Sequence, residues 1–332
     1  MPWAVAAGRA AFRSDPYDLI YSTSPHATAH LIAWRLAAYT RKPWVTDFRD
    51  PWHEDEPEPG APDGRVYRWA NKSLESKVIR ACHRVVASTT QLRDLLQTRY
   101  AAEPKQKMVA ILNGYDEADF ASIPACDPGS RDILVMLHAG SINADFRDPR
   151  PLFAALRKSA DDGEIDIGKI RLRFIGPGRY AESDEIRQCV RELKLEGVVE
   201  FLPRVSYDES IRELSRAGVL LLLQASPDTA SLVPAKLYEY LRTFRPVLAL
   251  VWPGATADVL AQTGGGWAVA PEQTHKLQET VRVIYDLWSR DKLGEIRADY
   301  GVLQQYDRRA LTGKLAAVFG ELTADGKRDS PS

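Results

Sequence analysis

The chain has 332 residues, of which 45% are hydrophobic and 27% are charged, and its 44 basic and 45 acidic side chains leave a formal net charge of −1. This length is sufficient for two domains. The balanced charge argues against bulk binding of nucleic acid, which usually goes with an excess of basic residues. The three cysteines, Cys82, Cys126 and Cys189, are far apart in sequence and form no CxxC or Cys/His cluster. Neither a disulfide framework nor a zinc site is therefore expected.

The start of the chain and its apolar runs give no sign of a membrane span or a signal peptide. The longest apolar run, Val247 to Trp252, has only the length of a strand, whereas a span requires roughly 18–20 residues. The first nine residues lack the basic region of a signal peptide, and they predict a helix up to about Phe12. We therefore expect a cytoplasmic protein. Peripheral contact with the inner face of the cell membrane remains open.

Short apolar runs alternate with helical stretches along the chain, which predicts mostly parallel sheets covered by helices on both faces. The strands expected in the first part are Leu19–Tyr21, Trp44–Thr46, Val85–Ala87 and Val109–Leu112. The helices expected between them are Ala27–Tyr39, Val66–Ala81 and Gln91–Arg99. The acidic, Pro- and Gly-rich residues 54–64 predict a mobile loop, and Asn113–Gly114 predicts a turn.

A second series of the same kind follows. Its expected strands are Ile133–His138, Leu172–Ile175, Val199–Leu202, Val219–Leu223, Val247–Val251 and Trp267–Val269. Its expected helices are Pro151–Ser159, Asp184–Leu193, Tyr207–Ala217, Ala235–Thr243 and Lys276–Trp288. The three consecutive glycines at 264–266 precede a strand instead of opening a helix, which predicts a turn and not a phosphate loop.

The two series predict an α/β protein of two Rossmann-like domains, with a ligand cleft at the carboxyl ends of their strands. The expected domains are residues 1–122 and 132–304, joined by a linker at 123–131. Residues 305–323 carry an apolar helical stripe that includes Leu311 and Leu315, and we expect this helix to return to the first domain. Residues 324–332 are expected to form a disordered tail.

The segment from Ser231 to Leu241 carries the pattern most typical of a binding site. A helix is expected to begin here after a strand, and a helix N-terminus offers free N–H groups and partial positive charge to a diphosphate. Lys236 adds a cation, and Glu239, one turn later, has a carboxylate suited to accept hydrogen bonds from ribose hydroxyls. From spacing alone, a surface Lys–Glu pair on an amphipathic helix explains the same pattern equally well.

These residues also carry a family resemblance. Pro234, Lys236, Glu239 and Tyr240, with Pro246–Val247 after them, resemble the donor-site signature of retaining GT-B glycosyltransferases of family 4. Further segments resemble that family in the same order: Tyr21–Pro25, Trp44–Trp52, Leu112–Asp116, Ala139–Ser141, Arg147–Pro149, Phe174–Gly178 and Val199–Val205. The resemblance implies the GT-B fold, retention of the anomeric configuration, and no strict requirement for a metal or cofactor.

The resemblance also implies the site residues. The residues implied in sugar-nucleotide binding are Gly140, Ser141, Arg204, Val205, Ser231, Leu232 and Glu239, and those implied in catalysis are Arg49, Asp50, Arg147 and Lys236. The chain departs from the family pattern at Ser231, where members often have an acidic residue, and at Ser141, where many have an arginine. Neutralisation of the diphosphate is therefore expected to fall to Arg147, Lys236 and backbone N–H groups.

The expected first domain contributes polar and aromatic side chains next to a strand end. Arg49 stands where relatives carry a histidine, and the Arg49–Asp50 pair beside tryptophans is either functional or a structural corner. Trp44, Trp52 and Trp69 offer faces for stacking on an acceptor sugar, although packing in the core is the more common role. The histidines His26, His30, His53 and His83 lack metal-ligand spacing and are expected to be polar surface or capping groups, whereas His138 ends a strand of the second domain.

The resulting hypothesis is a hexosyltransferase-type glycosyltransferase that moves a sugar from a nucleoside-diphosphate sugar to a glycan or lipid-linked acceptor. Its expected role is the synthesis of bacterial surface polysaccharide or glycolipid. One alternative is a non-catalytic sugar-nucleotide-binding remnant or partner subunit. Another is a GT-B sugar-nucleotide epimerase, which would require carboxylates placed to abstract a proton.

The start of the chain predicts an incomplete first domain. Only about 18 residues precede the strand at Leu19–Tyr21, too few for a βα unit and a further strand. We expect a first sheet of about four strands with Leu19–Tyr21 at its edge. Such an edge would favour self-association or a partner chain, and this form of the protein is expected to bind donor but to transfer slowly.

Overall fold

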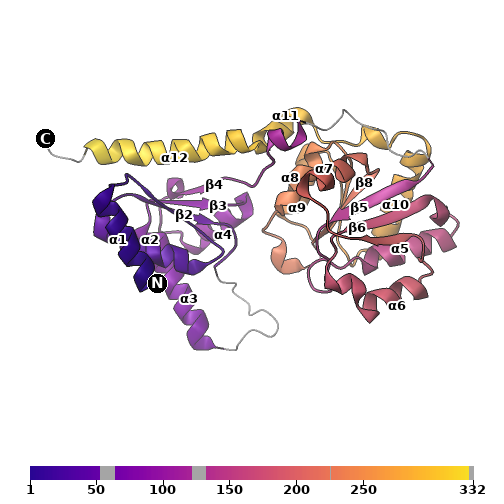
Figure 1. Cartoon of the computed structure of the whole chain (residues 1–332), viewed down its shortest axis with the longest axis horizontal. Coiled ribbons are helices and arrows are strands. Elements are labelled where there is room, and N and C mark those ends of the chain that lie inside the picture. The colour runs from indigo at the N-terminus through magenta and orange to yellow at the C-terminus, as the bar shows by residue number, and fades with distance from the viewer. Residues whose placement is uncertain (53–63, 122–131, 225, 329–332) are drawn as a thin grey trace. The chain divides into compact units, whose positions relative to one another are not determined.

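The computed structural model describes residues 1–52, 64–121, 132–224 and 226–328. The chain divides into two compact units (Figure 1), unit 1 formed by Met1–Asn113 with Arg309–Ser332 and unit 2 formed by Gly114–Arg308. The expected loop at 54–64, except for Gly64, and the expected linker at 123–131 lie outside the described residues. His53 and Cys126 lie outside them as well.

Unit 1 contains a parallel sheet of four strands in the order β1-β2-β3-β4 among the residues described. Its strands are Ile20–Thr23 (β1), Trp44–Phe48 (β2), Arg84–Ala87 (β3) and Met108–Ala110 (β4). Its helices are Pro2–Ser14 (α1), Ala27–Thr40 (α2), Arg65–Ala81 (α3), Thr90–Arg99 (α4) and Arg308–Arg328 (α12). The strand expected at Leu19–Tyr21 is β1, and it forms one edge of this sheet.

Both faces of the unit 1 sheet are covered. Successive side chains of a strand point to opposite faces, so Trp44 and Phe48 of β2 pack into one core cluster while Val45 packs into another. The first cluster includes Ala33 of α2, and the second includes Leu311 of α12. Figure 1 shows α2 and α12 on opposite sides of this sheet. The central strand β2 is buried along its whole length, as expected for a parallel strand covered on both sides.

The carboxyl-terminal helix supplies three buried side chains to unit 1. Leu311, Val318 and Leu322 of α12 form one cluster with Val45, Val86 and Ile111, and Leu315 packs against it. The helix begins at Arg308 and continues to Arg328, so the expectation of a disordered tail from Ala324 is wrong for residues 324–328. The apolar stripe that precedes these residues anchors the helix, which continues through them although they include Asp and Gly, two poor helix formers.

Unit 2 contains a parallel sheet of six strands in the order β10-β9-β8-β5-β6-β7 among the residues described. Its strands are Leu134–Ala139 (β5), Ile170–Ile175 (β6), Val199–Leu202 (β7), Val219–Gln224 (β8), Val247–Val251 (β9) and Gly266–Val269 (β10). Its helices are Arg150–Asp161 (α5), Asp184–Glu192 (α6), Tyr207–Arg216 (α7), Ala235–Arg242 (α8), Ala255–Thr263 (α9), Thr274–Ser289 (α10) and Tyr300–Leu303 (α11). The order of strands reverses between β5 and β8.

The boundary between the units falls at Asn113–Gly114, earlier than the expected boundary at residue 122. Tyr115 is buried, and its backbone N–H donates to the Tyr306 carbonyl at 3.1 Å. Glu117 forms an ion pair with Arg242 of α8. The segment that follows Gly114 is therefore held by unit 2 and not by the sheet of unit 1.

Candidate functional site

A large cavity lies in unit 2 at the carboxyl ends of β5, β6 and β7. Its volume is about 1180 Å³, and it is lined by the residues that follow these strands and by the first turns of α7 and α8. In open parallel sheets, ligands bind at this edge, beside the point where the strand order reverses. Of the residues predicted from the sequence to bind a sugar nucleotide, the cavity is lined by Gly140, Ser141, Arg204, Val205, Lys236 and Glu239.

Gly140 and Lys236 lie close together in the lining of this cavity. Gly140 has a φ of +119°, and a Cβ atom added to it would lie 2.8 Å from the Lys236 Nζ atom. Lys236 Nζ donates to the Ala139 carbonyl at 2.8 Å, and the Ala139 N–H donates to the Tyr240 hydroxyl at 3.0 Å. Glycine is therefore favoured here by the backbone conformation, and a larger side chain would displace the Lys236 ammonium from this position.

The ammonium group of Lys236 is held in a poorly hydrated position. The pKa of Lys236 is lowered to about 8, mainly by burial and next by the positive charge of Arg147, while the Glu239 charge acts in the opposite direction. Burial disfavours the charged form of a base. A bound anion next to this ammonium would favour the charged form again, so Lys236 has the electrostatic character of an anion-binding residue.

Glu239 is held by a tyrosine that the sequence analysis did not identify. The Tyr207 hydroxyl lies 3.1 Å from Glu239 Oε1 and 2.9 Å from Asp119 Oδ2. It carries a single proton and can donate to only one of these carboxylates at a time. Burial raises the pKa of Glu239, and burial followed by the Glu239 charge raises the pKa of Tyr207. The Tyr207 hydroxyl therefore occupies one hydrogen-bonding position of the Glu239 carboxylate.

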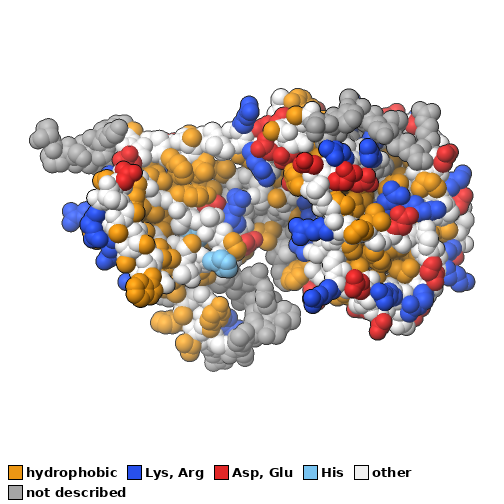
Figure 2. Space-filling view, in the orientation of Figure 1, with side chains coloured by type: hydrophobic (Ala, Val, Ile, Leu, Met, Phe, Trp, Pro, Cys, Tyr) orange, Lys and Arg blue, Asp and Glu red, His pale blue; other side chains and the backbone are white. Residues whose placement is uncertain are grey.

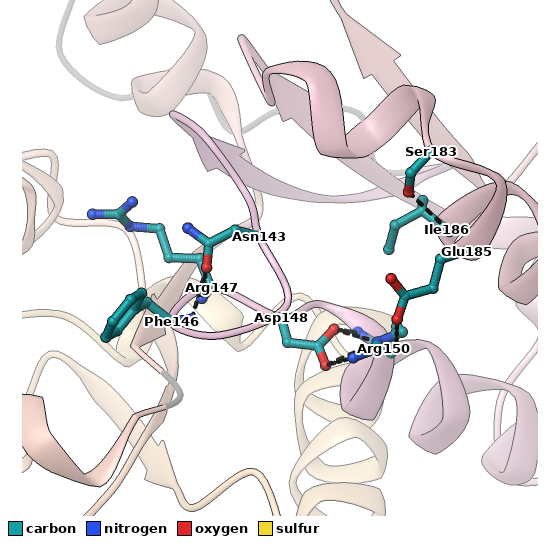
Figure 3. Close-up of polar contacts among 8 residues, drawn as sticks. All are labelled: Asn143, Phe146, Arg147, Asp148, Arg150, Ser183, Glu185 and Ile186. Atoms are coloured by element: carbon teal, nitrogen blue, oxygen red, sulfur yellow. Dashed lines mark hydrogen bonds and ion pairs between the residues drawn. The ribbon is translucent and has the colours of Figure 1, made fainter. Parts of the chain in front are cut away.

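The loop after β5 is built to hold Arg147 beside the cavity. Asn143 Oδ1 accepts from the backbone N–H groups of Phe146 and Arg147 at 2.7 and 3.1 Å. Asp148 and Arg150 form a multidentate pair, and Arg150 also pairs with Glu185 of α6. Figure 3 shows the Arg147 guanidinium extending away from this pair. Its Nη1 atom donates to Ser141 Oγ at 3.3 Å, so Arg147 reaches the cavity through Ser141.

The cavity is also lined by cationic side chains that the sequence alone did not indicate. Arg179 follows β6, and Arg187 lies on α6; with Arg204 and Lys236 they make four cations among the described lining residues, against Glu182 and Glu239. Figure 2 shows acidic and basic groups intermixed over the visible face of unit 2. The excess of cations among the lining residues thus contrasts with the mixed charges of this visible face.

Two predicted binding residues do not line this cavity. Ser231 and Leu232 are absent from its described lining. The Leu232 carbonyl instead accepts from Gln224 Nε2 at 3.3 Å and from Thr256 Oγ1 at 3.0 Å. These contacts hold the loop that precedes α8. The role of Ser231 and Leu232 in sugar-nucleotide binding stays a prediction.

Arg49 and Asp50 belong to unit 1, where they follow β2. The Arg49 backbone is anchored on both sides, because its N–H donates to Ser24 Oγ at 2.8 Å and its carbonyl accepts from Ser88 Oγ at 2.7 Å. The Arg49 guanidinium lies 3.8 Å from Asp47 and is exposed. Asp50 lines a second, smaller cavity of unit 1. The backbone of this segment is therefore anchored while its side chains present polar groups, and the roles of Arg49 and Asp50 stay a prediction.

The expected surface or capping role of His30 is wrong, because the residue is fully buried. Among the three tryptophans, Trp44 is fully buried and Trp69 is exposed, and Trp52 lines the second cavity with Asp50. His138 is also buried, and burial lowers its pKa to about 3. Its Nδ1 atom lies 2.9 Å from the Leu221 carbonyl.

The described part of the chain holds no group of three or more His, Cys, Asp or Glu side chains that could bind a metal ion. Within the same residues, none of the helices combines the length and the apolar character that crossing a membrane requires.

Comparisons with known proteins agree with this geometry. Residues 1–114 match the glycosyl transferase 4-like domain family, and no curated protein sequence matches the chain significantly. The HepE protein of Anabaena in complex with UDP superposes with a TM-score of 0.74 and 16% identity, over 96% of this chain and 82% of that one.

The chain has the GT-B fold. Sucrose-phosphate synthase of Thermosynechococcus elongatus superposes with a TM-score of 0.70 and 17% identity, over 98% of this chain and 78% of that one. A glycosyltransferase of Rickettsia africae superposes with a TM-score of 0.70 and 16% identity, over 96% of this chain and 80% of that one. The family match is limited to residues 1–114, and the likeness to these solved structures is one of fold.

Proposed function

We propose that the protein is a retaining glycosyltransferase of the hexosyltransferase type, which moves a sugar from a nucleoside-diphosphate sugar to a glycan or lipid-linked acceptor. The observation that carries the proposal is the cavity of unit 2. There Lys236, the Gly140 backbone and the N-terminus of α8 meet at the carboxyl ends of the strands. This combination of a cation, a close backbone approach and a helix N-terminus suits a diphosphate.

The remaining cavity residues divide between the two ends of such a donor. The Glu239 carboxylate would accept hydrogen bonds from the ribose hydroxyls. It would then lose the hydrogen bond that the Tyr207 hydroxyl donates to it in the structure. Arg147, which reaches Ser141, would face the diphosphate together with Lys236. The hydrogen bonds to the Leu232 carbonyl would hold the loop ahead of α8, which also contains Ser231, and thereby place the N-terminal N–H groups of that helix.

The proposed chemistry depends on charge that develops on the leaving group. As the bond between the sugar and the diphosphate breaks, the sugar becomes oxocarbenium-like and the departing diphosphate gains negative charge. Lys236 and Arg147 would stabilise that charge without reorganisation, the kind of contribution that is often largest in catalysis. Arg49 and Asp50 would act on the acceptor side, from the loop that follows β2.

We propose a UDP-sugar as the donor and a bacterial surface polysaccharide or glycolipid as the product. HepE of Anabaena, which this chain resembles in fold, has structures in complex with UDP and with UDP-glucose. We further propose that the protein works in the cytoplasm, at the inner face of the cell membrane, where lipid-linked acceptors are available.

A panel of UDP-, GDP- and ADP-sugars tests the proposal. Each is incubated with the full chain, with and without an acceptor mixture, and the products are identified by mass. Release of nucleoside diphosphate together with a glycosylated acceptor is expected for one sugar nucleotide. Binding without any product would indicate a sugar-nucleotide-binding subunit, and a new isomer of the sugar nucleotide would indicate an epimerase; either result would contradict a transferase.

A further inference from the structure

The Tyr207 hydroxyl lies between two carboxylates that come from separate segments of unit 2. It is 3.1 Å from Glu239 Oε1, on α8, and 2.9 Å from Asp119 Oδ2, on the 3-10 turn Glu117–Phe120. Tyr207 and Glu239 line the unit 2 cavity, whereas Asp119 is not among the described residues that line it. Asp119 therefore reaches a ligand in this cavity through Tyr207 and not by direct contact.

The turn that carries Asp119 is anchored away from the cavity. Asp116 Oδ1 accepts from the Ala118 N–H at 3.0 Å, and the Asp119 N–H donates to the Asp116 carbonyl at 3.1 Å. Phe120 is buried, and the Arg242 guanidinium lies over its ring at 5.0 Å. The Asp119 carboxylate is therefore held beside Tyr207 by contacts that a ligand in the cavity would not disturb.

One hydroxyl proton serves two carboxylates here. The Tyr207 hydroxyl can donate to Glu239 or to Asp119, but not to both at once. Burial raises the pKa of Glu239, the hydrogen bond from Tyr207 lowers it, and the Asp119 charge raises it. The hydrogen bond from Tyr207 thus stabilises the buried charge of Glu239 while the cavity is empty.

A ligand hydroxyl that donates to Glu239 would compete with Tyr207 for this carboxylate. A hydroxyl that is displaced and finds no acceptor carries a cost in free energy. Asp119 removes most of that cost, because its Oδ2 atom is already within hydrogen-bond distance of the tyrosine. The O–H bond only has to turn from one carboxylate to the other, and the proton stays on the tyrosine. Burial, followed by the Glu239 charge, raises the pKa of Tyr207 and keeps it protonated.

We propose that Asp119 is a positioning residue of the donor site, which accepts the Tyr207 hydroxyl when a ribose hydroxyl takes its place on Glu239. Tyr207 then has two positions, one donating to Glu239 in the empty cavity and one donating to Asp119 in the occupied cavity. The inference rests on the proposed function, because it requires a ligand with ribose hydroxyls at Glu239. It goes further by giving Asp119 a role that depends on the state of the cavity.

Calorimetry on the full chain tests the inference with two probes, UDP and inorganic pyrophosphate. Pyrophosphate carries the charge but no ribose, so its binding should leave Tyr207 on Glu239. Asp119→Ala removes the second acceptor and should weaken UDP binding roughly threefold to tenfold, whereas pyrophosphate affinity should not fall. Asp119→Asn keeps an acceptor oxygen and should lose less. Asp208→Asn, an exposed carboxylate on α7, is the matched control and should leave both affinities unchanged.

A double-mutant cycle separates this role from a purely structural one. In Tyr207→Phe there is no hydroxyl to displace, so the further change Asp119→Ala should leave UDP affinity unchanged. A residue that only supports the fold would weaken UDP binding equally in both backgrounds, and the cycle measures the difference. Thermal unfolding of each variant confirms that the turn Glu117–Phe120 still packs on unit 2.

The outcomes distinguish this inference from the proposed function. The inference is wrong if Asp119→Ala leaves UDP affinity unchanged in the wild-type background or lowers it equally in Tyr207→Phe. It is also wrong if pyrophosphate affinity falls as much as UDP affinity. If the wild-type chain prefers GDP or ADP, the cycle uses that nucleotide. Failure of the wild-type chain to bind any of the three would overturn the proposed function, and this inference with it.

Discussion

The two cavities occupy equivalent places in their sheets but differ in their charges. Both lie at the carboxyl ends of parallel strands and next to the start of a helix. The unit 2 cavity has four Lys or Arg side chains among its described lining residues, whereas that of unit 1 has Asp50 and histidines. The architecture therefore provides the location of each cavity, and the side chains that line it determine its charge.

The largest effect is expected from the cation of unit 2. Lys236→Ala should lower turnover about 10²–10³-fold, because it removes a preorganised charge that faces the leaving diphosphate. Affinity for the donor should fall less, since the charge to be stabilised is largest in the transition state. Steady-state kinetics and calorimetry measure both. Lys276→Ala, an exposed lysine on α10, is the control, and equal losses in turnover and affinity would identify Lys236 as a ground-state anchor instead.

The next effect concerns the carboxylate of the same cavity. Glu239→Ala should weaken donor binding by roughly 1–3 kcal/mol, because ribose hydroxyls lose a charged acceptor. Tyr207→Phe removes the hydroxyl that occupies Glu239 in the structure, so it should leave affinity unchanged or raise it. Calorimetry measures the donor affinity of both variants. A folded Glu239→Ala protein with wild-type affinity would exclude Glu239 from the site, and weaker binding by Tyr207→Phe would contradict competition between tyrosine and ribose.

A smaller effect should appear with pH. The pKa of Lys236 is lowered to about 8 in the empty cavity, and a bound diphosphate should raise it. Below pH 8 the Lys236 side chain is already charged before UDP binds. Above pH 8 the side chain is mostly neutral, so it must take up a proton when UDP binds. UDP affinity should therefore fall about tenfold between pH 7 and pH 9. Calorimetry in buffers of different ionisation enthalpy would detect the uptake. The same decrease of UDP affinity in Lys236→Met would assign the pH dependence to another group.

The smallest effect is expected from the pair that anchors the loop after β5. Asp148→Asn loses the charge that pairs with Arg150, but the guanidinium is partly exposed, so the cost should be about 1 kcal/mol or less. Thermal unfolding should shift by a few degrees at most. Turnover should decrease modestly, because Arg147 becomes less well placed. A fall in turnover as large as that of Lys236→Ala would show that Asp148 acts directly at the site.

The sequence was sufficient to predict an element where one local pattern of residues determines that element. The apolar runs located each strand to within one or two residues, because buried parallel strands are nearly continuous hydrophobic segments. The helix α9 was missed because Ala255–Thr263 buries several of its small and polar residues and shows no simple apolar stripe. The glycine that ends it, Gly264, has a φ of +68°, which agrees with the turn expected there.

The residues of the site that were missed required the fold. Lys236 and Glu239 belong to one helix turn, so their spacing could be recognised in the sequence. Tyr207 comes from the start of α7 and meets Glu239 only because both helices begin at the same edge of the sheet. His30 was assigned to the surface because histidine is usually at least partly exposed. It is buried because α2 presents that face to Phe48.

The helix α12 has a consequence for the synthesis of the protein. Val45, Val86 and Ile111 emerge early from the ribosome, whereas their partners Leu311, Val318 and Leu322 emerge last. At about 5–20 residues per second, the roughly 200 residues between them take on the order of 10–40 s to make. During that time one face of the unit 1 sheet has no cover. Unit 2 is complete before unit 1 can close, although unit 1 is translated first, so the order of maturation is the reverse of the order of translation.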